Sequence, residues 1–175
     1  MSTLPPETEA LLTAHYQQQG WGTPLEVITY ERVPGLFQAE FADGADYVVV
    51  QDGKVVAGKG LAALGTYMRA VDLLAHRPEA KDLTTLLAVF GALPPVSGYA
   101  TPDQFYDYAK HAQLNPKVEL AGDAGRLILH YLVPRQGGPV PNPNLVTVKR
   151  WTLEIPKTYK LAWHEAETKL DTSGP

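Results

Sequence analysis

The sequence predicts an α+β fold in which an antiparallel β-sheet packs against helices. Two observations predict this class. Apolar residues alternate with a period of two in the segments expected as strands, on either side of a middle segment where they recur with helical spacing. A regular alternation of strands with helices is missing, so a parallel, Rossmann-like sheet is not expected.

The length of 175 residues favours one domain with a substantial core. The expected order is an N-terminal helix, a four-stranded meander, a helical middle segment and a C-terminal three-stranded meander. The single domain 1–175 is expected to contain a helix at 6–19, strands within 25–57, helices within 60–113, strands within 117–166 and a frayed tail at 167–175.

The first helix is predicted over residues 6–19. Pro5 and Pro6 fit a first helical turn, where the missing N–H would be unbonded in any case. Gly20 follows the last residue of the helical pattern and predicts the C-terminal stop.

The four-stranded meander follows from three turn signals. The strand candidates are separated by Pro34-Gly35, Asp43-Gly44 and Asp52-Gly53. The last of these is the strongest hairpin signal in the chain, because a tight two-residue hairpin favours this pair. Within the strand candidate 46–51, residues 47–50 leave little polar on either face, so we expect this strand to be central in the sheet.

Helical spacing returns in the middle of the chain. One helix is expected from Gly60 to His76, because a basic residue and Pro78 follow it. A second is expected over residues 79–92. A third begins at Thr101-Pro102, where a capping box coincides with a proline at the first helical position.

The last third of the chain returns to strands. A short strand at 118–120 precedes the three-stranded meander, whose first strand covers residues 126–133 and whose other two form a long hairpin within 145–166. We place the hairpin connection at residues 156–158. A longer loop remains an alternative, because this connection lacks the glycine that a three-residue loop prefers.

This connection fixes the expected register of the hairpin. It puts Trp151 opposite Trp163 on one face and Arg150 opposite His164 on the other. Slipping the register by one residue would move Trp151 to the other face.

The candidate binding residues are His130, Arg135, Arg150, Glu154 and His164. Arg150, Glu154 and His164 share the hairpin face opposite the tryptophans, and His130 joins them if its strand presents the same face. A guanidinium offers carboxylates a planar fork, which suits this face to an anionic ligand or partner. The simpler interpretation is a solvated face with ordinary charge pairs.

Arg135 is a candidate for a different reason, because it lies in the loop 134–144, which is rich in proline, glycine and asparagine. Long loops on rigid strands often contact partners. A mobile, solvated connection is the simpler interpretation.

No motif for catalysis, metal or cofactor binding is present. The chain has no cysteine, which excludes disulfides, thiol catalysis and thiolate metal sites. His164 and Glu165 would point to opposite faces of a strand, so they do not predict a metal site. A nucleophile elbow and a phosphate loop are missing, and no cofactor is expected.

Net charge and hydropathy limit the classes of partner and the cellular locations that we expect for this protein. The formal net charge of −4 gives no bulk electrostatic case for nucleic-acid binding. No apolar run approaches the length of a membrane span. As written, the start lacks a signal peptide, so a cytoplasmic protein is expected, or a bacterial envelope protein if a signal peptide has been removed.

Three functions are compatible with the sequence. We favour a non-enzymatic binding or accessory domain that contacts a protein partner or small ligand through a sheet face or the loop 134–144. One alternative is a small-molecule enzyme or carrier, with a pocket that uses His130, Arg150 or His164. The other is a structural subunit that assembles through an exposed strand edge, although the sequence does not fix an oligomeric state.

Overall fold

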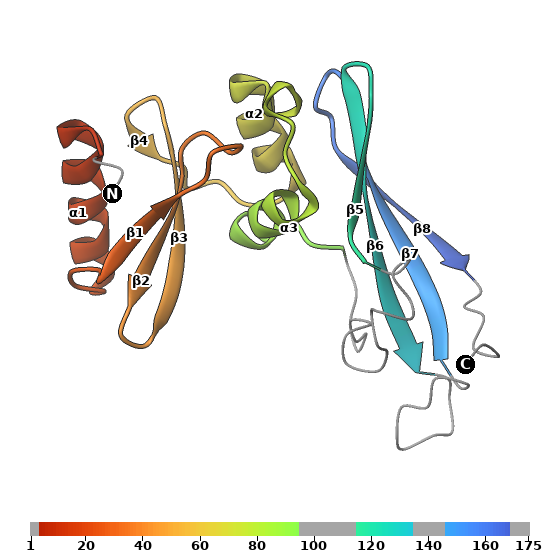
Figure 1. Cartoon of the computed structure of the whole chain (residues 1–175), viewed down its shortest axis with the longest axis horizontal. Coiled ribbons are helices and arrows are strands. Elements are labelled where there is room, and N and C mark those ends of the chain that lie inside the picture. Colours follow the sequence, from red (N-terminus) through yellow and green to blue (C-terminus); the bar gives the residue numbers. More distant parts are fainter. Residues whose placement is uncertain (1–3, 95–114, 135–145, 169–175) are drawn as a thin grey trace. The chain divides into compact units, whose positions relative to one another are not determined.

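The computed structural model describes residues 4–94, 115–134 and 146–168 of the chain. In this part it contains three α-helices and two four-stranded antiparallel sheets, which confirms the α+β class (Figure 1). The elements are α1 (Pro6–Gln19), β1 (Glu26–Thr29), β2 (Leu36–Phe41), β3 (Gly44–Gln51), β4 (Lys54–Val55), α2 (Leu61–Val71), the 3₁₀ turn η1 (Leu73–His76), α3 (Ala80–Val89), β5 (Lys117–Ala121), β6 (Ala124–Pro134), β7 (Val146–Ile155) and β8 (Ala162–Thr168).

The chain divides into two compact units. Unit 1 comprises residues 1–78 and 85–92, and unit 2 comprises residues 79–84 and 93–175. The expectation of a single domain remains a prediction, and a single cooperative unfolding transition is its signature.

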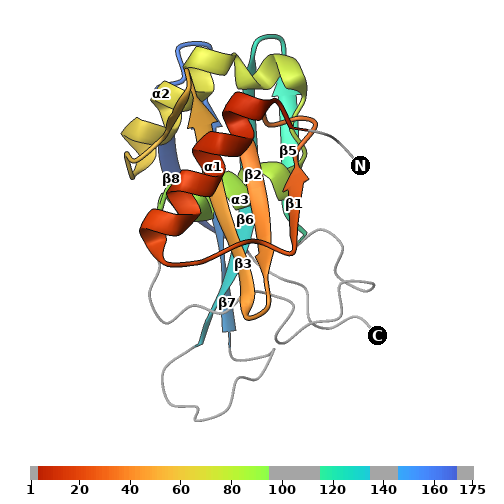
Figure 2. The same cartoon turned by 90° about the vertical axis from the view of Figure 1, so that its left-hand side faces the viewer.

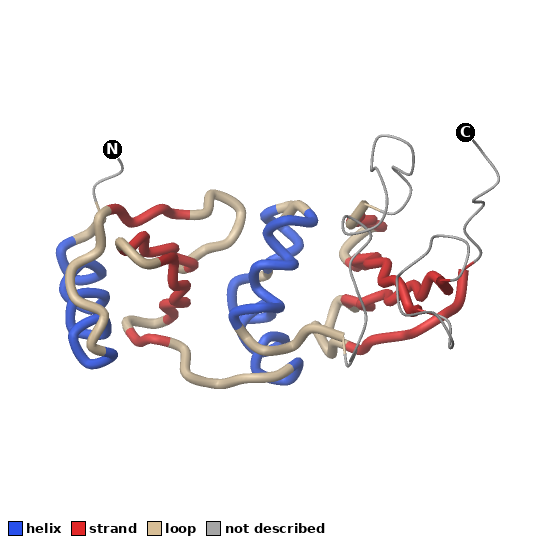
Figure 3. The backbone as a smooth tube through the Cα atoms, turned by 90° about the horizontal axis from the view of Figure 1, so that it is seen from below, coloured by secondary structure: helices blue, strands red, loops and turns tan. Residues whose placement is uncertain are grey.

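Helix α1 of unit 1 lies along one face of the β1–β4 sheet (Figures 2 and 3). Leu12 and Tyr16 are one helical turn apart, and both are buried in a cluster with Phe37, Ala39 and Val48 of the sheet. Burying a large apolar side chain contributes about 1.5–3 kcal/mol, so this spacing fixes which side of the helix meets the sheet.

The ends of α1 agree with the sequence. The helix starts at Pro6 and is followed by Gly20, which has a left-handed backbone with φ of +74°. The N–H groups of Gly20 and Trp21 then bond back to the last turn of the helix. This is the geometry that favours glycine at a helix C-terminus.

The predicted turns of the first meander are present. The N–H of Leu36 donates to the carbonyl of Val33 at 3.2 Å and closes the turn that contains Pro34-Gly35. Asp52-Gly53 joins β3 to β4 with positive φ at both residues, as a tight hairpin requires. The strand order β1-β2-β3-β4 places β3 between two neighbours, as its apolar composition predicts.

The helix expected from Gly60 to His76 is interrupted, which corrects that prediction. Helix α2 ends at Val71, Asp72 has a left-handed φ of +48°, and the chain continues as η1. The break leaves Ala75 exposed, although Ala75 continues the helical spacing of the apolar residues Met68 and Val71. Aspartate tolerates this backbone better than most residues, but the sequence pattern gave no sign of it.

Unit 1 also holds a buried tyrosine whose hydroxyl has a backbone partner. Tyr67 of α2 donates its hydroxyl to the carbonyl oxygen of Pro34, in the turn before β2. Burial raises the pKa of Tyr67 above its ordinary value, because the phenolate would lose its hydration.

We expect Tyr67→Phe to lower the free energy of unfolding by about 1–3 kcal/mol at neutral pH, because the Pro34 carbonyl loses its partner. The pKa of Tyr67 is higher in the folded than in the unfolded chain. The corresponding stability is complete below the unfolded pKa of about 10 and is lost as the pH rises above it. The variant should therefore lose less stability than the parent between about pH 9 and about pH 11.

Urea unfolding at these pH values measures both effects. Tyr47→Phe is the matched control, because Tyr47 lies in the neighbouring sheet with its side chain exposed. Equal alkaline losses in the parent and in Tyr67→Phe would contradict the assignment.

Unit 2 contains the C-terminal sheet, in the order β5-β6-β7-β8. Its meander has four strands, one more than the three expected. The short segment predicted at 118–120 extends over Lys117–Ala121 and pairs along β6. Strand β8 continues to Thr168, two residues beyond the predicted end of the strands.

The register of β7 and β8 differs by two residues from the expected one. Arg150 lies opposite Ala166, and Trp151 lies opposite Glu165. The direct pairs of Arg150 with His164 and of Trp151 with Trp163 are therefore wrong. Because the difference is an even number of residues, both predicted faces are preserved.

The longer connection explains this difference. Residues 156–161 separate the two strands, in place of the three residues expected. The N–H of Tyr159 donates to the carbonyl of Pro156 at 2.8 Å, and Tyr159 has a left-handed φ of +59° with a buried side chain. The buried ring offsets a backbone that a non-glycine residue rarely adopts.

Three predictions fall outside the described residues. They are the third helix from Thr101-Pro102, the loop after Pro134 with Arg135, and the polar tail after Thr168.

Candidate functional site

The β5–β8 sheet of unit 2 has one apolar and one polar face. The apolar face contains the buried residues Leu127, Leu129, Trp151, Leu153 and Ile155. The side chains between them in sequence point the other way and form what we call the polar face. Strand pairing places these residues on it: Lys117, Glu119, Arg126, Ile128, His130, Arg150, Thr152, Glu154, Ala162, His164 and Ala166.

Three of the five candidate residues lie in adjacent rows of the polar face. His130 is directly opposite Arg150 on the neighbouring strand. His164 is opposite Thr152 in the next row, so it is a diagonal neighbour of Arg150. Side chains in such positions are about 5–8 Å apart, which a single bound group can bridge.

The other two candidates are not shown to be neighbours of Arg150. Glu154 lies on the same face but four residues along β7 from Arg150, a distance of about 13 Å. It is opposite Arg126 on β6 and Ala162 on β8, which makes it a diagonal neighbour of His164 but not of Arg150. Arg135 belongs to the residues that the structure does not describe.

The carboxylate on β5 is already paired. Glu119 lies 3.9 Å from the Nζ of Lys117 and 4.0 Å from the Nε of Arg126. These side chains are exposed, so each pair contributes little to stability. Their effect is to balance charge in this part of the polar face.

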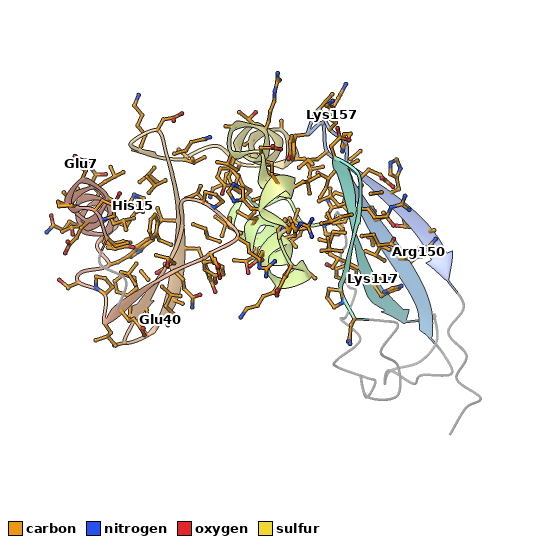
Figure 4. The ribbon with its side chains drawn as sticks, turned by 45° about the horizontal axis from the view of Figure 1, so that its top comes forward. Glu7, His15, Glu40, Lys117, Arg150 and Lys157 are labelled. Atoms are coloured by element: carbon orange, nitrogen blue, oxygen red, sulfur yellow. The ribbon has the colours of Figure 1, made fainter. Side chains whose placement is uncertain are left out.

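Arg150 is in a different situation. Its side chain is exposed, and it makes no ion pair within the described residues. Figure 4 shows it beside β7 and β8, while Lys157 marks the opposite end of the sheet. An exposed guanidinium next to two imidazoles can bind a carboxylate, because its N–H groups donate charge-assisted hydrogen bonds to the carboxylate oxygens.

A second polar group, which was not among the predicted site residues, lies on the other side of the sheet. The Nζ of Lys149 is 3.2 Å from a carboxylate oxygen of Glu165. Nearby, the rings of Trp151 and Trp163 make an edge-to-face contact with centroids 6.2 Å apart. The signal was available, because alternation puts Lys149 on the tryptophan face of β7.

Two further properties of the described residues concern metal binding and membrane insertion. Among residues 4–94, 115–134 and 146–168, no group of three or more histidine or carboxylate side chains could hold a metal ion. In the same residues, no helix has both the length and the apolar character needed to cross a bilayer.

Comparisons with protein-family models, with characterised proteins and with solved structures give no significant match to this chain.

Proposed function

We propose that this chain is a non-enzymatic binding domain, and that the polar face of its C-terminal sheet recognises carboxylate groups of a protein partner or small ligand. The observation that carries the proposal is the position of Arg150. It lies in a row with His130 and next to the row of His164, and the nearest carboxylate on its strand and face is about 13 Å away.

The chemistry of the cluster supports an anionic partner. Arginine binds carboxylates in a bidentate geometry, and each charge-assisted hydrogen bond is stronger than a neutral one. Imidazoles can donate further hydrogen bonds to the same group. The chain as a whole carries a net charge of −4, whereas the row of His130 and Arg150 and the row of His164 next to it contain no carboxylate.

The enzyme or carrier alternative has less support. It requires two of His130, Arg150 and His164 in a shared, partly buried pocket. Arg150 and His164 are both exposed, and only His130 is partly buried. We therefore prefer recognition at a surface to catalysis in a pocket.

The test is a titration of the ¹⁵N-labelled protein with an oligoglutamate peptide, followed by amide chemical shifts. We expect shifts along β6, β7 and β8. The double variant Arg150→Ala/His164→Ala should bind at least about tenfold more weakly, because hydrogen bonds to charged groups contribute about 1.5–3 kcal/mol each.

A matched control removes the same residue types elsewhere. Arg69→Ala/His76→Ala deletes one exposed arginine and one exposed histidine from unit 1. It changes the net charge equally and should leave the affinity unchanged. Absence of peptide binding at low salt, or equal weakening by both double variants, would overturn the proposal.

A further inference from the structure

Strand β1 is an outer strand of the unit 1 sheet. It pairs with β2 on one side and has no strand neighbour on the other among the described residues (Figure 2). Three of its four residues are exposed. An outer strand of this kind presents backbone N–H and C=O groups that can pair with another strand.

Exposed apolar side chains gather next to this edge. Ile28 of β1 is 37 % exposed, and Tyr47 of β3 is 38 % exposed. Strand pairing aligns them in one row across the sheet, with Gln38 between them. Leu25, directly before β1, is 77 % exposed and is the most exposed of the large apolar side chains in the described residues.

The other outer strands carry features that oppose further pairing. Strand β4 has only two residues, one of them a lysine. Strand β5 carries Lys117 and Glu119, and β8 carries Glu165. Short length and charged side chains are the usual means of protecting an edge. Strand β1 has one charged residue, at its first position.

We propose that β1 pairs antiparallel with β1 of a second copy of this chain, about a two-fold axis at Ile28. The proposal uses residues of unit 1 and none of the polar face, so it stands independently of the proposed function.

The register follows from the strand itself. In a two-fold antiparallel pair, opposed residues must lie on the same face, so their numbers add up to an even sum. Centring the pair on Ile28 places the two isoleucines opposite each other and Thr29 opposite Val27. It also separates the two copies of Glu26, which already faces Glu40 within its own sheet.

The second copy is the occupant that this edge fits best, because the central residue is apolar and complements itself. Pairing would join the rows of Ile28 and Tyr47 of both copies across one continuous sheet. In this register residues 27–29 of the two copies oppose each other, so the contact is short. Interfaces well below about 1,200 Å² give weak association, so we expect dimers that form with rising concentration.

Sedimentation velocity of the full chain from micromolar to millimolar concentration tests the association. The parent should shift from a monomer to twice the monomer mass. Ile28→Lys should remain monomeric over the same range, because a charge at the centre of the edge opposes pairing. Leu120→Lys, which replaces a similarly exposed side chain of β5, should dimerise like the parent.

Cross-linking tests the register, and the absence of cysteine makes any introduced thiol unique. Under mild oxidation Ile28→Cys should give a disulfide-linked dimer, while Leu120→Cys should stay monomeric. A parent that is monomeric at every concentration would overturn the proposal and leave the edge to a strand of another protein. Equal cross-linking of both cysteine variants, or equal loss of dimer in both lysine variants, would also overturn it.

Discussion

Gly35→Ala is expected to lower the free energy of unfolding by about 2–5 kcal/mol, because about 1–2 kcal/mol of backbone strain adds to about 1–3 kcal/mol of steric overlap. Gly35 has a left-handed φ of +84°, and a Cβ at this position would lie 2.1 Å from the carbonyl oxygen of Val50. The contact is with backbone, so no side chain can rotate away from it. In addition, the Gly35 carbonyl accepts the N–H of Val50 at 2.8 Å, which holds the two strands together at this point.

Gly53→Ala is the matched control in the same sheet. Gly53 has a similar φ of +72°, but a Cβ there would meet no atom within 4 Å. It should cost only the backbone strain of about 1–2 kcal/mol. Urea unfolding followed by circular dichroism measures both variants. If the two losses were equal, β2 and β3 would be able to move apart at Gly35, contrary to the expectation.

The second large effect is expected at the centre of the C-terminal sheet. Leu153 is fully buried. It lies opposite the equally buried Leu127 on β6 and opposite Trp163 on β8. Leu153→Ala removes apolar contacts and leaves a cavity on the buried face of this sheet. Such substitutions cost about 2–5 kcal/mol.

Tryptophan fluorescence during urea unfolding follows this variant, because Trp151 and Trp163 lie in the same sheet. Leu120→Ala on β5 is the control, since its side chain is 45 % exposed and its loss should cost less than about 0.5 kcal/mol. A loss below about 1 kcal/mol for Leu153→Ala would mean that the sheet closes over the cavity.

The same two core variants test the expectation of one domain. Gly35 belongs to unit 1 and Leu153 to unit 2. In a single cooperative domain, both substitutions shift one common transition. In a chain with two independent domains, Gly35→Ala shifts the transition reported by Trp21, and Leu153→Ala shifts the one reported by Trp151 and Trp163.

Local chemistry made the turns and helix ends predictable. Gly20, Gly35 and Gly53 all have the positive φ angles that glycine in a turn or after a helix suggested, and Asp52 shares this backbone. A turn or helix end involves only a few neighbouring residues, so its conformational preference is contained in a short stretch of sequence. The faces of β7 and β8 were predictable for a related reason, because side chains alternate with a fixed period of two.

Several features depended on contacts between distant residues. The two-residue difference in the β7–β8 register arises from the connection at 156–161, where the buried Tyr159 holds a backbone that its residue type disfavours. The interruption of the second helix at Asp72 places Leu73 and Leu74 in the core, at the expense of Ala75. Neither outcome follows from propensity, because burial overrides local preference.

For the candidate binding residues, too, the sequence determined some features and contacts between distant residues determined others. Alternation alone placed Arg150, Glu154 and His164 on one face, and the structure adds His130 to it through the pairing of β6 with β7. The four-residue spacing within one strand already separated Glu154 from Arg150, and only the register of β6 with β7 decided that His130 is adjacent to Arg150. The sequence by itself therefore determined the fold class, the turns and the faces of the strands, because these follow from local conformation and periodicity. The tertiary structure decided which residues meet, because strand register and edge exposure depend on packing across the whole sheet.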